Sequence, residues 1–355
     1  MASKVTIQDI ADALGLSRNT VSKAINNTGV LADATRERIL AKAVEMGYKQ
    51  FSYISASGVS NLSAPTAPND KNEIAVFTTL FLNTSHFAST MLDKFQREAA
   101  QLGYSISLHR ILPEDLQACV LPKSVNAERT AGIVCFEVFD EAYARMVSEC
   151  GIPALFVDAP VLTDGRPLEA DRLLMDNTAG INAFIHHMAR RGKTKIGFIG
   201  EYMHCQSFFE RYMAYRNAMF LCGLPIDEET CFTGNLTEEE NVMSDRYRSY
   251  LYHRFKNLKE LPDVFVCAND FIAFDAIQVF KLLGISVPND LYLFGFDDSP
   301  ESRLITPTMS TVHIHSQIMG YSATQLLISR INEPSLNFRT VHTESTLILR
   351  ESTGD

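Results

Sequence analysis

The stretch SRNTVSKAIN, residues 17–26, decides how the rest of the chain is interpreted. If it is a helix, its apolar side chains fall on one side and short polar or basic side chains fall on the other. Arg18 and Asn19 lie on the polar side, and their paired donors and acceptors match the edges of guanine and adenine in the major groove. The serine, threonine and lysine side chains beside them suit phosphate oxygens. This pattern predicts a DNA-reading surface, although a ten-residue amphipathic helix is also common on any globular surface.

The residues before and after this stretch favour the DNA interpretation. Thr6, followed three residues later by Asp9, is typical of a helix start with a capping box. An apolar stripe follows, Gly15 breaks this helix, and Ser17 caps the next one. Two helices joined by a tight turn that contains glycine form a helix-turn-helix. A third helix over about residues 33–46 completes a small three-helix core.

The length and charge of the chain bound its class. At 355 residues, 46% of them hydrophobic, the chain is long enough for two or three domains with real cores. The formal net charge is −10, but residues 1–50 hold seven Lys or Arg and five Asp or Glu. Residues 1–50 therefore carry +2 and the remainder carries −12. A mildly basic head on an acidic body is expected to bind DNA in one orientation, because the phosphates repel the body.

Cysteine usage and the N-terminal sequence predict a cytoplasmic protein. The chain has seven cysteines and no Cys-x-x-Cys pair, which favours reduced, structural thiols. The N-terminal sequence lacks the charged and apolar segments of a signal peptide, and no apolar run approaches membrane-spanning length. We therefore expect a protein that is neither exported nor embedded in a membrane.

After the helical head, the chain alternates short apolar runs with amphipathic stretches. Serine and proline recur in residues 50–71, which we interpret as a linker. From residue 72 onward, the alternation predicts an α/β body in which helices cover both faces of doubly wound parallel sheets. Two successive sheets are expected, because so many strands would overfill a single one. The predicted strands are residues 74–77, 104–108, 132–136, 154–157, 195–199, 264–267 and 291–294.

Polar residues follow several of these strands, at the end where such sheets bind ligands. They are Asp158, Asn269-Asp270 and Asp297-Asp298. Their carboxylates and amides suit the hydroxyls of a small polar ligand. The aromatic residues expected to stack on its apolar faces are Phe87, Phe136, Phe208, Phe209 and Phe296. For any single Asp or Asn, however, capping of the next helix or a turn preference is the simpler explanation.

The head and the body together resemble one known family. VTIQDIADALGLSRNTVSKAIN at residues 5–26, TRERI at 35–39 and MGY at 46–48 closely resemble the headpiece of the LacI/GalR family of bacterial transcription regulators. In the body, the family's order is followed by GKTKIGFI at 192–199, RYMAY at 211–215, AND at 268–270, GISVPND at 284–290 and GFDD at 295–298. The resemblance covers nearly the whole chain.

This resemblance implies a homodimer whose headpieces enter two half-sites of a near-palindromic operator, with a periplasmic-binding-protein-like body that closes on an effector. It implies a helix-turn-helix headpiece at residues 1–49, a linker at 50–71 and a two-lobed body at 72–355. The first lobe is expected at about 72–174 and 315–340, and the second at about 175–314 and 341–351. Effector and operator would then alter each other's affinity by the same factor. Release of repression by an inducer is favoured over corepression.

The resemblance also assigns roles to individual residues. Arg18 and Asn19 match base-reading positions, Lys23 and Asn26 also face DNA, and Thr6, Ser17, Thr20 and Ser22 match phosphate contacts. Arg211, Asn269 and Asp297 match the effector-binding arginine, asparagine and aspartate, and His86-Phe87 occupy the position of an aromatic pair. Such groups suit a ring of hydroxyls, so we expect a carbohydrate effector, although the sequence identifies neither the effector nor the operator.

The linker departs from the family pattern. Where the family has Pro-Asn, then Ala-Arg, then a leucine that enters the minor groove, this chain has Gln50-Phe51, Ile54-Ser55 and Ser57. We therefore expect no leucine wedge and little bending of the operator. Residues that are able to substitute for the wedge are Tyr53, Ile54 and Leu62.

Two other functions compete with this interpretation. His313-x-His315 would place two imidazoles on one face of a strand, but no third metal ligand is evident. Asp297 and Asp298 could also be interpreted as the acid pair of an enzyme. Adjacent residues of a strand point in opposite directions, however, so their carboxylates would not flank one substrate bond. The chain contains neither of the glycine motifs that bind phosphate groups, Gly-x-Gly-x-x-Gly and Gly-x-x-x-x-Gly-Lys. We therefore expect no enzymatic activity, metal or cofactor. A solute-binding receptor without regulatory DNA binding is the remaining alternative.

Overall fold

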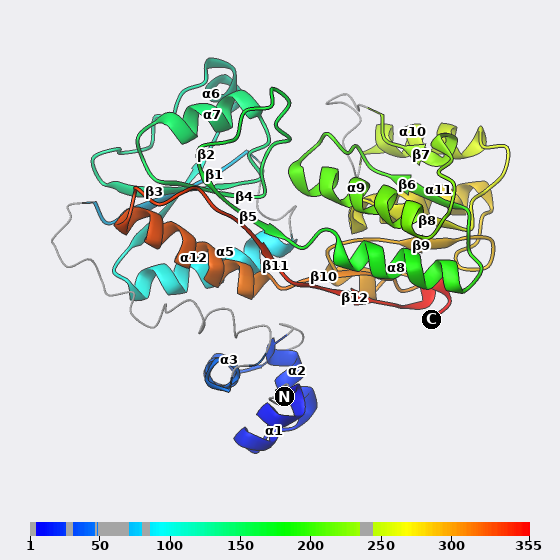
Figure 1. Cartoon of the computed structure of the whole chain (residues 1–355), viewed down its shortest axis with the longest axis horizontal. Coiled ribbons are helices and arrows are strands. Elements are labelled where there is room, and N and C mark those ends of the chain that lie inside the picture. The colour runs from blue at the N-terminus through cyan, green and yellow to red at the C-terminus, as the bar shows by residue number, and fades with distance from the viewer. Residues whose placement is uncertain (1–4, 26–30, 47, 49–70, 80–85, 235–243) are drawn as a thin grey trace.

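The computed structural model contains a helical head and a two-lobed body (Figure 1). It describes residues 5–25, 31–46, 48, 71–79, 86–234 and 244–355. Almost all of the linker and Asn26 lie outside these residues, so the expectation of a missing wedge stays a prediction. Within the described residues, no helix is both long enough and apolar enough to cross a bilayer.

Three short helices form the head, and local sequence signals account for their ends. They are α1 (Ile7–Leu14), α2 (Arg18–Ile25) and α3 (Asp33–Glu45). Thr6 and Asp9 form the capping box, and Gly15 ends α1 at a φ of 65°, a left-handed conformation that glycine adopts without strain. The Ser17 hydroxyl accepts the Thr20 N–H at 3.1 Å. The core contains Ile10, Ala11, Val21, Ala24, Ile25, Ile39 and Ala43. The predicted helix-turn-helix is confirmed.

The first lobe is built on a six-stranded parallel sheet with the order β11-β5-β4-β3-β1-β2. Its strands are β1 (Glu73–Thr78), β2 (Ser105–Arg110), β3 (Thr130–Phe136), β4 (Ala154–Val157), β5 (Asp171–Met175) and β11 (Thr340–Thr343). Ile74 and Val76 belong to the apolar cluster that includes α5 (His86–Gln101) and α12 (Ser316–Asn332). Ala75 and Phe77 point to the opposite face, toward α6 (Pro113–Ala118) and α7 (Glu141–Glu149). Because helices cover both faces, the middle strands β3 and β4 are almost entirely apolar.

The second lobe has a four-stranded parallel sheet with the order β7-β6-β8-β9. Its strands are β6 (Ile196–Ile199), β7 (Cys231–Phe232), β8 (Val264–Cys267) and β9 (Tyr292–Phe294). Around it lie α8 (Ala179–Arg190), α9 (Gln206–Leu221), α10 (Asp245–Lys256) and α11 (Asp270–Leu283), with short 3-10 turns at Glu228–Thr230, Pro300–Arg303 and Glu351–Thr353. The Phe184 ring of α8 stacks on that of Phe294 at 3.8 Å. Two doubly wound parallel sheets confirm the predicted α/β class.

An antiparallel ribbon connects the lobes. It consists of β10 (Thr311–Ile314) and β12 (Ser345–Ile348) (Figure 1). The chain passes between the lobes after β5, after β10 and after β11. Because β5 ends at Met175 and β11 at Thr343, the first lobe extends one and three residues past the boundaries expected at 174 and 340. β11 reads Thr-Val-His-Thr, so it lacks the apolar run by which a buried strand is predicted.

Candidate DNA-binding helix and inter-lobe site

Helix α2 separates an apolar face from a polar face. Its apolar side chains are buried in the core of the head. Arg18, Asn19 and Lys23 are exposed, and Thr20 and Ser22 are half-buried. The guanidinium, amide and ammonium groups therefore lie on the solvent side of one short helix, the size of element that enters the major groove.

The hydroxyls expected to contact phosphates take part in helix caps. Thr6 Oγ1 donates to Asp9 Oδ2 at 2.8 Å, and Ser17 Oγ lies 2.8 Å from Thr20 Oγ1. These side chains mark the N-termini of α1 and α2, where backbone N–H groups and the helix dipole favour an anion. The start of α2 has no acidic residue in its first turn and is chemically suited to a phosphate oxygen, whereas the Asp9 carboxylate already lies at the start of α1.

Arg211 is the centre of a second cluster, between the lobes. It lies on α9, the second-lobe helix nearest the first lobe in Figure 1, and only 3% of it is exposed. Its Nε donates to Asn177 Oδ1 at 2.9 Å, and its Nη1 donates to the Ala268 carbonyl at 2.7 Å. The guanidinium carbon lies 3.6 Å from the centroid of the Phe296 ring, within the range of a cation–π interaction. The protein therefore holds this cation firmly where the lobes meet.

Carboxylates from both lobes surround Arg211. Asp297 Oδ1 lies 3.5 Å from Arg211 Nη1. Burial raises the pKa of Asp297 to about 7, opposed by the charge of Arg211 and assisted by Glu137 and Asp158. The backbone φ is 114° at Asp297, 52° at Glu137 and 57° at Asp158. Non-glycine residues rarely adopt such angles, which cost about 1–3 kcal/mol each and cluster at ligand sites. A strained acidic cluster around a buried arginine is typical of a polar-ligand site.

Asp158 also joins the two lobes. It follows β4 of the first lobe, yet its Oδ1 accepts the N–H of Ser207 in α9 at 3.1 Å as well as that of Ala159 at 2.8 Å. Burial raises the pKa of Asp158. A carboxylate at a helix N-terminus is a favourable placement, so this contact stabilises the observed arrangement of the lobes. Movement of one lobe against the other would change it.

Asn269 and Asp270, at the start of α11, form hydrogen bonds that hold the second lobe together. Asn269 Oδ1 accepts the Ile272 N–H at 3.0 Å, so the capping explanation holds for that oxygen, and the amide nitrogen is what Asn269 can offer a ligand. Asp270 is buried and accepts the Ser299 N–H at 2.8 Å and the Thr311 hydroxyl at 2.7 Å. These bonds fasten α11 to β10 and to the turn after β9.

For two of the aromatic residues, the prediction that they stack on a ligand is wrong. Phe136 is fully buried in the core of the first lobe, because the alternation of β3 turns this side chain toward the covering helices. Phe296 is 1% exposed, and the Arg211 guanidinium covers its ring. The ring therefore stacks on the arginine.

The other three aromatic residues differ in position. Phe208 is half-buried, with its ring centroid 5.6 Å from the Arg211 guanidinium carbon, and it stays a candidate. Phe209 lines a hollow of about 410 Å³ between α8 and α9, which does not include Arg211 or Asp297. Phe87 is half-buried against the core at the start of α5. The side chain of His86 lies outside the described part of the chain.

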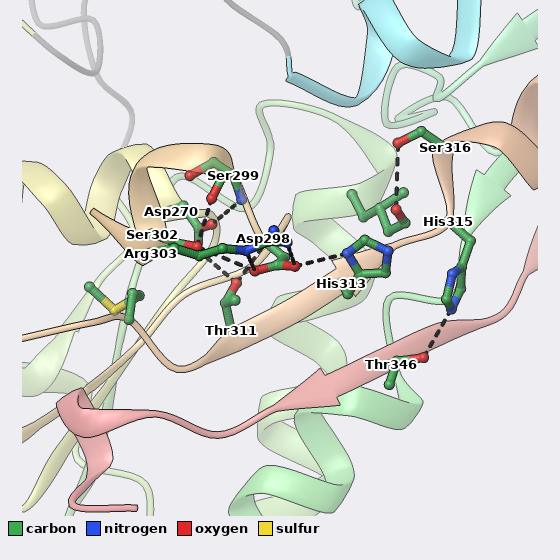
Figure 2. A network of polar contacts seen from close by, with 12 residues as sticks. Asp270, Asp298, Ser299, Ser302, Arg303, Thr311, His313, His315, Ser316 and Thr346 are labelled. Carbon is green, nitrogen blue, oxygen red and sulfur yellow. Dashed lines mark hydrogen bonds and ion pairs between the residues drawn. The ribbon is translucent and has the colours of Figure 1, made fainter. Parts of the chain in front are cut away.

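Asp298 and the two histidines form structural contacts (Figure 2). The buried Asp298 carboxylate accepts hydrogen bonds from two arginines and from His313. Burial raises the pKa of the Asp298 carboxyl, but these hydrogen bonds lower it overall. His313 points to Asp298, whereas His315 points to Thr346, with Nε2 2.9 Å from Oγ1. Throughout the described residues, no three His, Cys, Asp or Glu side chains are grouped to hold a metal ion.

Sequence reasoning misses three polar residues near Arg211 or Asp297. They are Asn177 after β5, Glu210 on α9 and Glu137 after β3. β5 begins with Asp171-Arg172, so its pattern does not mark a strand or draw attention to Asn177. Glu137 directly follows a predicted strand, and the strand-end rule would have identified it.

Known protein families match both parts of the chain. The model for bacterial regulatory proteins of the lacI family matches residues 6–50, and the periplasmic binding protein-like domain matches residues 185–353. The HTH-type transcriptional regulator GalR of Lacticaseibacillus casei is 27% identical over 98% of this chain and 99% of its own length. The HTH-type transcriptional repressor PurR of Actinobacillus pleuropneumoniae serotype 3 (strain JL03) is 26% identical over 98% of each chain.

Solved structures share the fold of head and body. A complex of the transcriptional regulator CelR with cellobiose has a TM-score of 0.67 at 21% identity, over 98% of this chain and all of that chain. The lac repressor dimer bound to operator and the anti-inducer ONPF has a TM-score of 0.64 at 20% identity, over 99% of each chain.

Proposed function

Because the chain belongs to the lacI family of bacterial regulatory proteins and is a DNA-binding transcription regulator, we propose that a small polar effector, a carbohydrate, controls its operator affinity from between the lobes. It is a regulator rather than an enzyme, as its relatives are. The observation that carries the effector proposal is buried Arg211, with Asp297 3.5 Å away at the inter-lobe site. Its place of action is the cytoplasm, where its DNA lies.

DNA recognition rests on the exposed face of α2. Arg18 and Asn19 read base edges, Lys23 and Asn26 assist, and the hydroxyls of Thr6, Ser17, Thr20 and Ser22 contact phosphates. One head covers only half of a near-palindromic site, so the functional unit is a dimer. The lac repressor structure is a dimer bound to operator, which supports the same assembly for this chain.

A carbohydrate suits the inter-lobe site chemically. The Asp297 carboxylate accepts hydrogen bonds from neighbouring hydroxyls, while the Arg211 guanidinium and the Asn269 amide nitrogen donate them. The Phe208 ring, beside Arg211, offers an apolar surface for the sugar face. Phe87 and His86 are assigned a role in sugar binding by the family resemblance. The related CelR structure holds cellobiose, which supports a sugar as the class of effector.

Effector and operator are coupled through the relative position of the lobes. A ligand held by groups of both lobes favours one arrangement over others, and the contact of Asp158 with the start of α9 changes with it. The linkers leave the first lobe, so the spacing of the two heads changes as well. Linkage requires each ligand to alter the affinity for the other by the same factor. The favoured direction is release of DNA by an inducer.

A paired measurement tests this function. Operators are selected from random duplexes, and binding is followed by fluorescence anisotropy with cellobiose, D-galactose, D-galacturonate or hypoxanthine present. The same compounds are screened by melting temperature, because a ligand at a hundredfold excess over its Kd stabilises by about 2.7 kcal/mol. We expect one sugar to raise the melting temperature and to lower operator affinity.

The control for this measurement is Arg18→Ala, which is expected to lose operator preference and to keep the sugar response. A sugar that raises operator affinity identifies a corepressor. A response to hypoxanthine alone replaces the carbohydrate assignment by a purine. Sugar binding without any DNA sequence preference in the unaltered chain would identify a solute receptor.

A further inference from the structure

A chain of polar contacts leads from Arg211 across the lobe boundary. Arg211 Nε donates to Asn177 Oδ1 at 2.9 Å, and Asn177 Nδ2 donates to Glu210 Oε2 at 2.8 Å. The same carboxylate accepts from Gln206 Nε2 at 3.0 Å, and it lies 3.3 Å from Nε2 of His342. Glu210 and Arg211 lie on α9 of the second lobe, whereas His342 lies on β11, at the edge of the first-lobe sheet. The contact of His342 with Glu210 therefore joins the lobes.

Exposure increases along this chain of contacts. Asn177 is fully buried and Arg211 is 3% exposed. The side-chain exposure is 19% at Glu210 and 42% at His342. The outer end can thus exchange protons with solvent, while the inner end is almost entirely buried.

We propose that Asn177 and Glu210 position Arg211 for effector binding, and that the proton on His342 strengthens this positioning. The inference rests on the effector site proposed above. An amide has an oxygen that accepts and a nitrogen that donates, so its orientation depends on its partners. An ionised carboxylate only accepts. Asn177 Nδ2 also donates to Ser207 Oγ at 3.3 Å, a longer bond than the one to Glu210. Glu210 is therefore the stronger of the two α9 acceptors that turn the Asn177 nitrogen toward α9 and its oxygen toward the Arg211 Nε–H.

Charges around His342 set the pH range of the effect. The hydrogen bond to Glu210 raises the pKa of His342; the charge of Asp176 also raises it, while burial and Arg172 lower it. These groups face His342 from α9, from β5 and from the turn after β5. Burial raises the pKa of Glu210, but hydrogen bonds from His342, Asn177 and Gln206 lower it overall. The ion pair is therefore complete between the pKa of Glu210 and the pKa of His342 in the folded protein, and it is lost as the pH rises through the pKa of His342.

The first experiment detects Arg211 directly and needs no effector. Full-length protein is labelled with 15N-arginine, and the Nε–Hε signal of Arg211 is assigned by its loss in Arg211→Lys. We expect this signal to resist exchange with water in the unaltered chain, and to exchange at least about tenfold faster in Asn177→Ala and Glu210→Ala, because one charge-assisted bond is lost. Asp297, 3.5 Å from Arg211, titrates in the same range, so the effect of His342 is taken as the difference in the pH-dependent shift between the unaltered chain and His342→Gln. Between about pH 6 and about pH 8 this difference should show a midpoint above the ordinary histidine value of about 6.5.

The second experiment measures effector affinity by calorimetry, with the sugar that gives the largest thermal shift in the screen above. Glu210→Ala is expected to weaken binding about tenfold. Asp297 titrates in the same pH range, so the effect of His342 is taken as the difference between the unaltered chain and His342→Gln at each pH. This difference should vanish at high pH, where His342 is neutral in the unaltered chain. The matched control is His187→Gln, because His187 on α8 lies 3.6 Å from Asp355, away from Arg211.

The two experiments separate the possible failures. If the Arg211 signal is unchanged in Glu210→Ala and shows no midpoint that depends on His342, the positioning is refuted. If that signal behaves as expected but no sugar binds, the positioning stands and the carbohydrate assignment fails. If the pH-dependent shift in His342→Gln is the same as in the unaltered chain, or if His187→Gln changes it as much as His342→Gln does, the role of His342 is refuted.

Discussion

Replacement of Asp297 by asparagine tests whether the inter-lobe site sacrifices stability for ligand binding. Burial raises the pKa of the Asp297 carboxyl from 3.8 to about 7. In the unfolded chain this carboxyl regains its ordinary pKa, so between these pH values the folded protein binds one proton more than the unfolded chain. The stability that Asp297 contributes is therefore fully present below about pH 4 and is lost as the pH rises toward 7.

The size of this loss follows from the shift. A shift of about three pKa units, at about 1.4 kcal/mol per unit, corresponds to about 4 kcal/mol at pH 8. The Asp297 side chain is 16% exposed. Water therefore solvates the carboxylate in part and reduces the loss of stability. Asparagine has nearly the same shape, carries no charge and tolerates positive φ better than most residues. We expect Asp297→Asn to raise the free energy of unfolding by about 1–4 kcal/mol at pH 8, and by less than half as much at pH 5.

Urea unfolding of the body, followed by circular dichroism at both pH values, measures this difference. Asp355→Asn is the matched control: Asp355 pairs with Arg191 at 2.8 Å at the surface, and such exposed pairs contribute about 0–1 kcal/mol. Calorimetry should show that Asp297→Asn no longer binds the sugar, because the site has lost its charged acceptor. The reasoning fails if Asp297→Asn is no more stable than the unaltered chain at pH 8, or if the gain is the same at both pH values.

Four further predictions concern DNA binding, effector binding and assembly. Arg18→Ala should weaken operator binding by about 1–3 kcal/mol and relax its sequence preference, whereas Thr20→Ala should weaken binding to operator and to random DNA alike. If Arg18→Ala also weakened binding to operator and to random DNA equally, base reading by Arg18 would be contradicted. Arg211→Ala should keep its operator affinity in anisotropy titrations and lose the sugar response, and a normal sugar titration would remove the assignment. Light scattering of dilute protein should give a dimer, and a stable tetramer would contradict it. Gel phasing should show little operator bending, and one or two base pairs inserted at the operator centre should be tolerated; a strong bend with a steep loss of affinity would indicate a folded hinge helix.

The sequence alone determines the features that depend on residues near one another in the chain. The capping box of Thr6 and Asp9, the left-handed Gly15 and the burial of one face of α2 all follow from spacings of three or four residues. Strands β3, β4 and β8 can also be predicted from the sequence, because helices bury both of their faces and their residues form continuous apolar runs. β5 and β11, which mix polar and apolar residues, and β7, which has only two residues, lack that signal.

Only the tertiary structure decides what the polar and aromatic residues at the strand ends do. Asn269 and Asp297 follow strands in similar patterns, yet Asn269 caps a helix and Asp297 lies beside Arg211. Asp158 reaches into the other lobe, and Asn177 enters the site from a strand that the pattern does not reveal. The physical reason is that a pKa, a hydrogen-bond partner or the exposure of a ring depends on groups brought together from distant parts of the chain, which the spacing of residues along one strand does not encode.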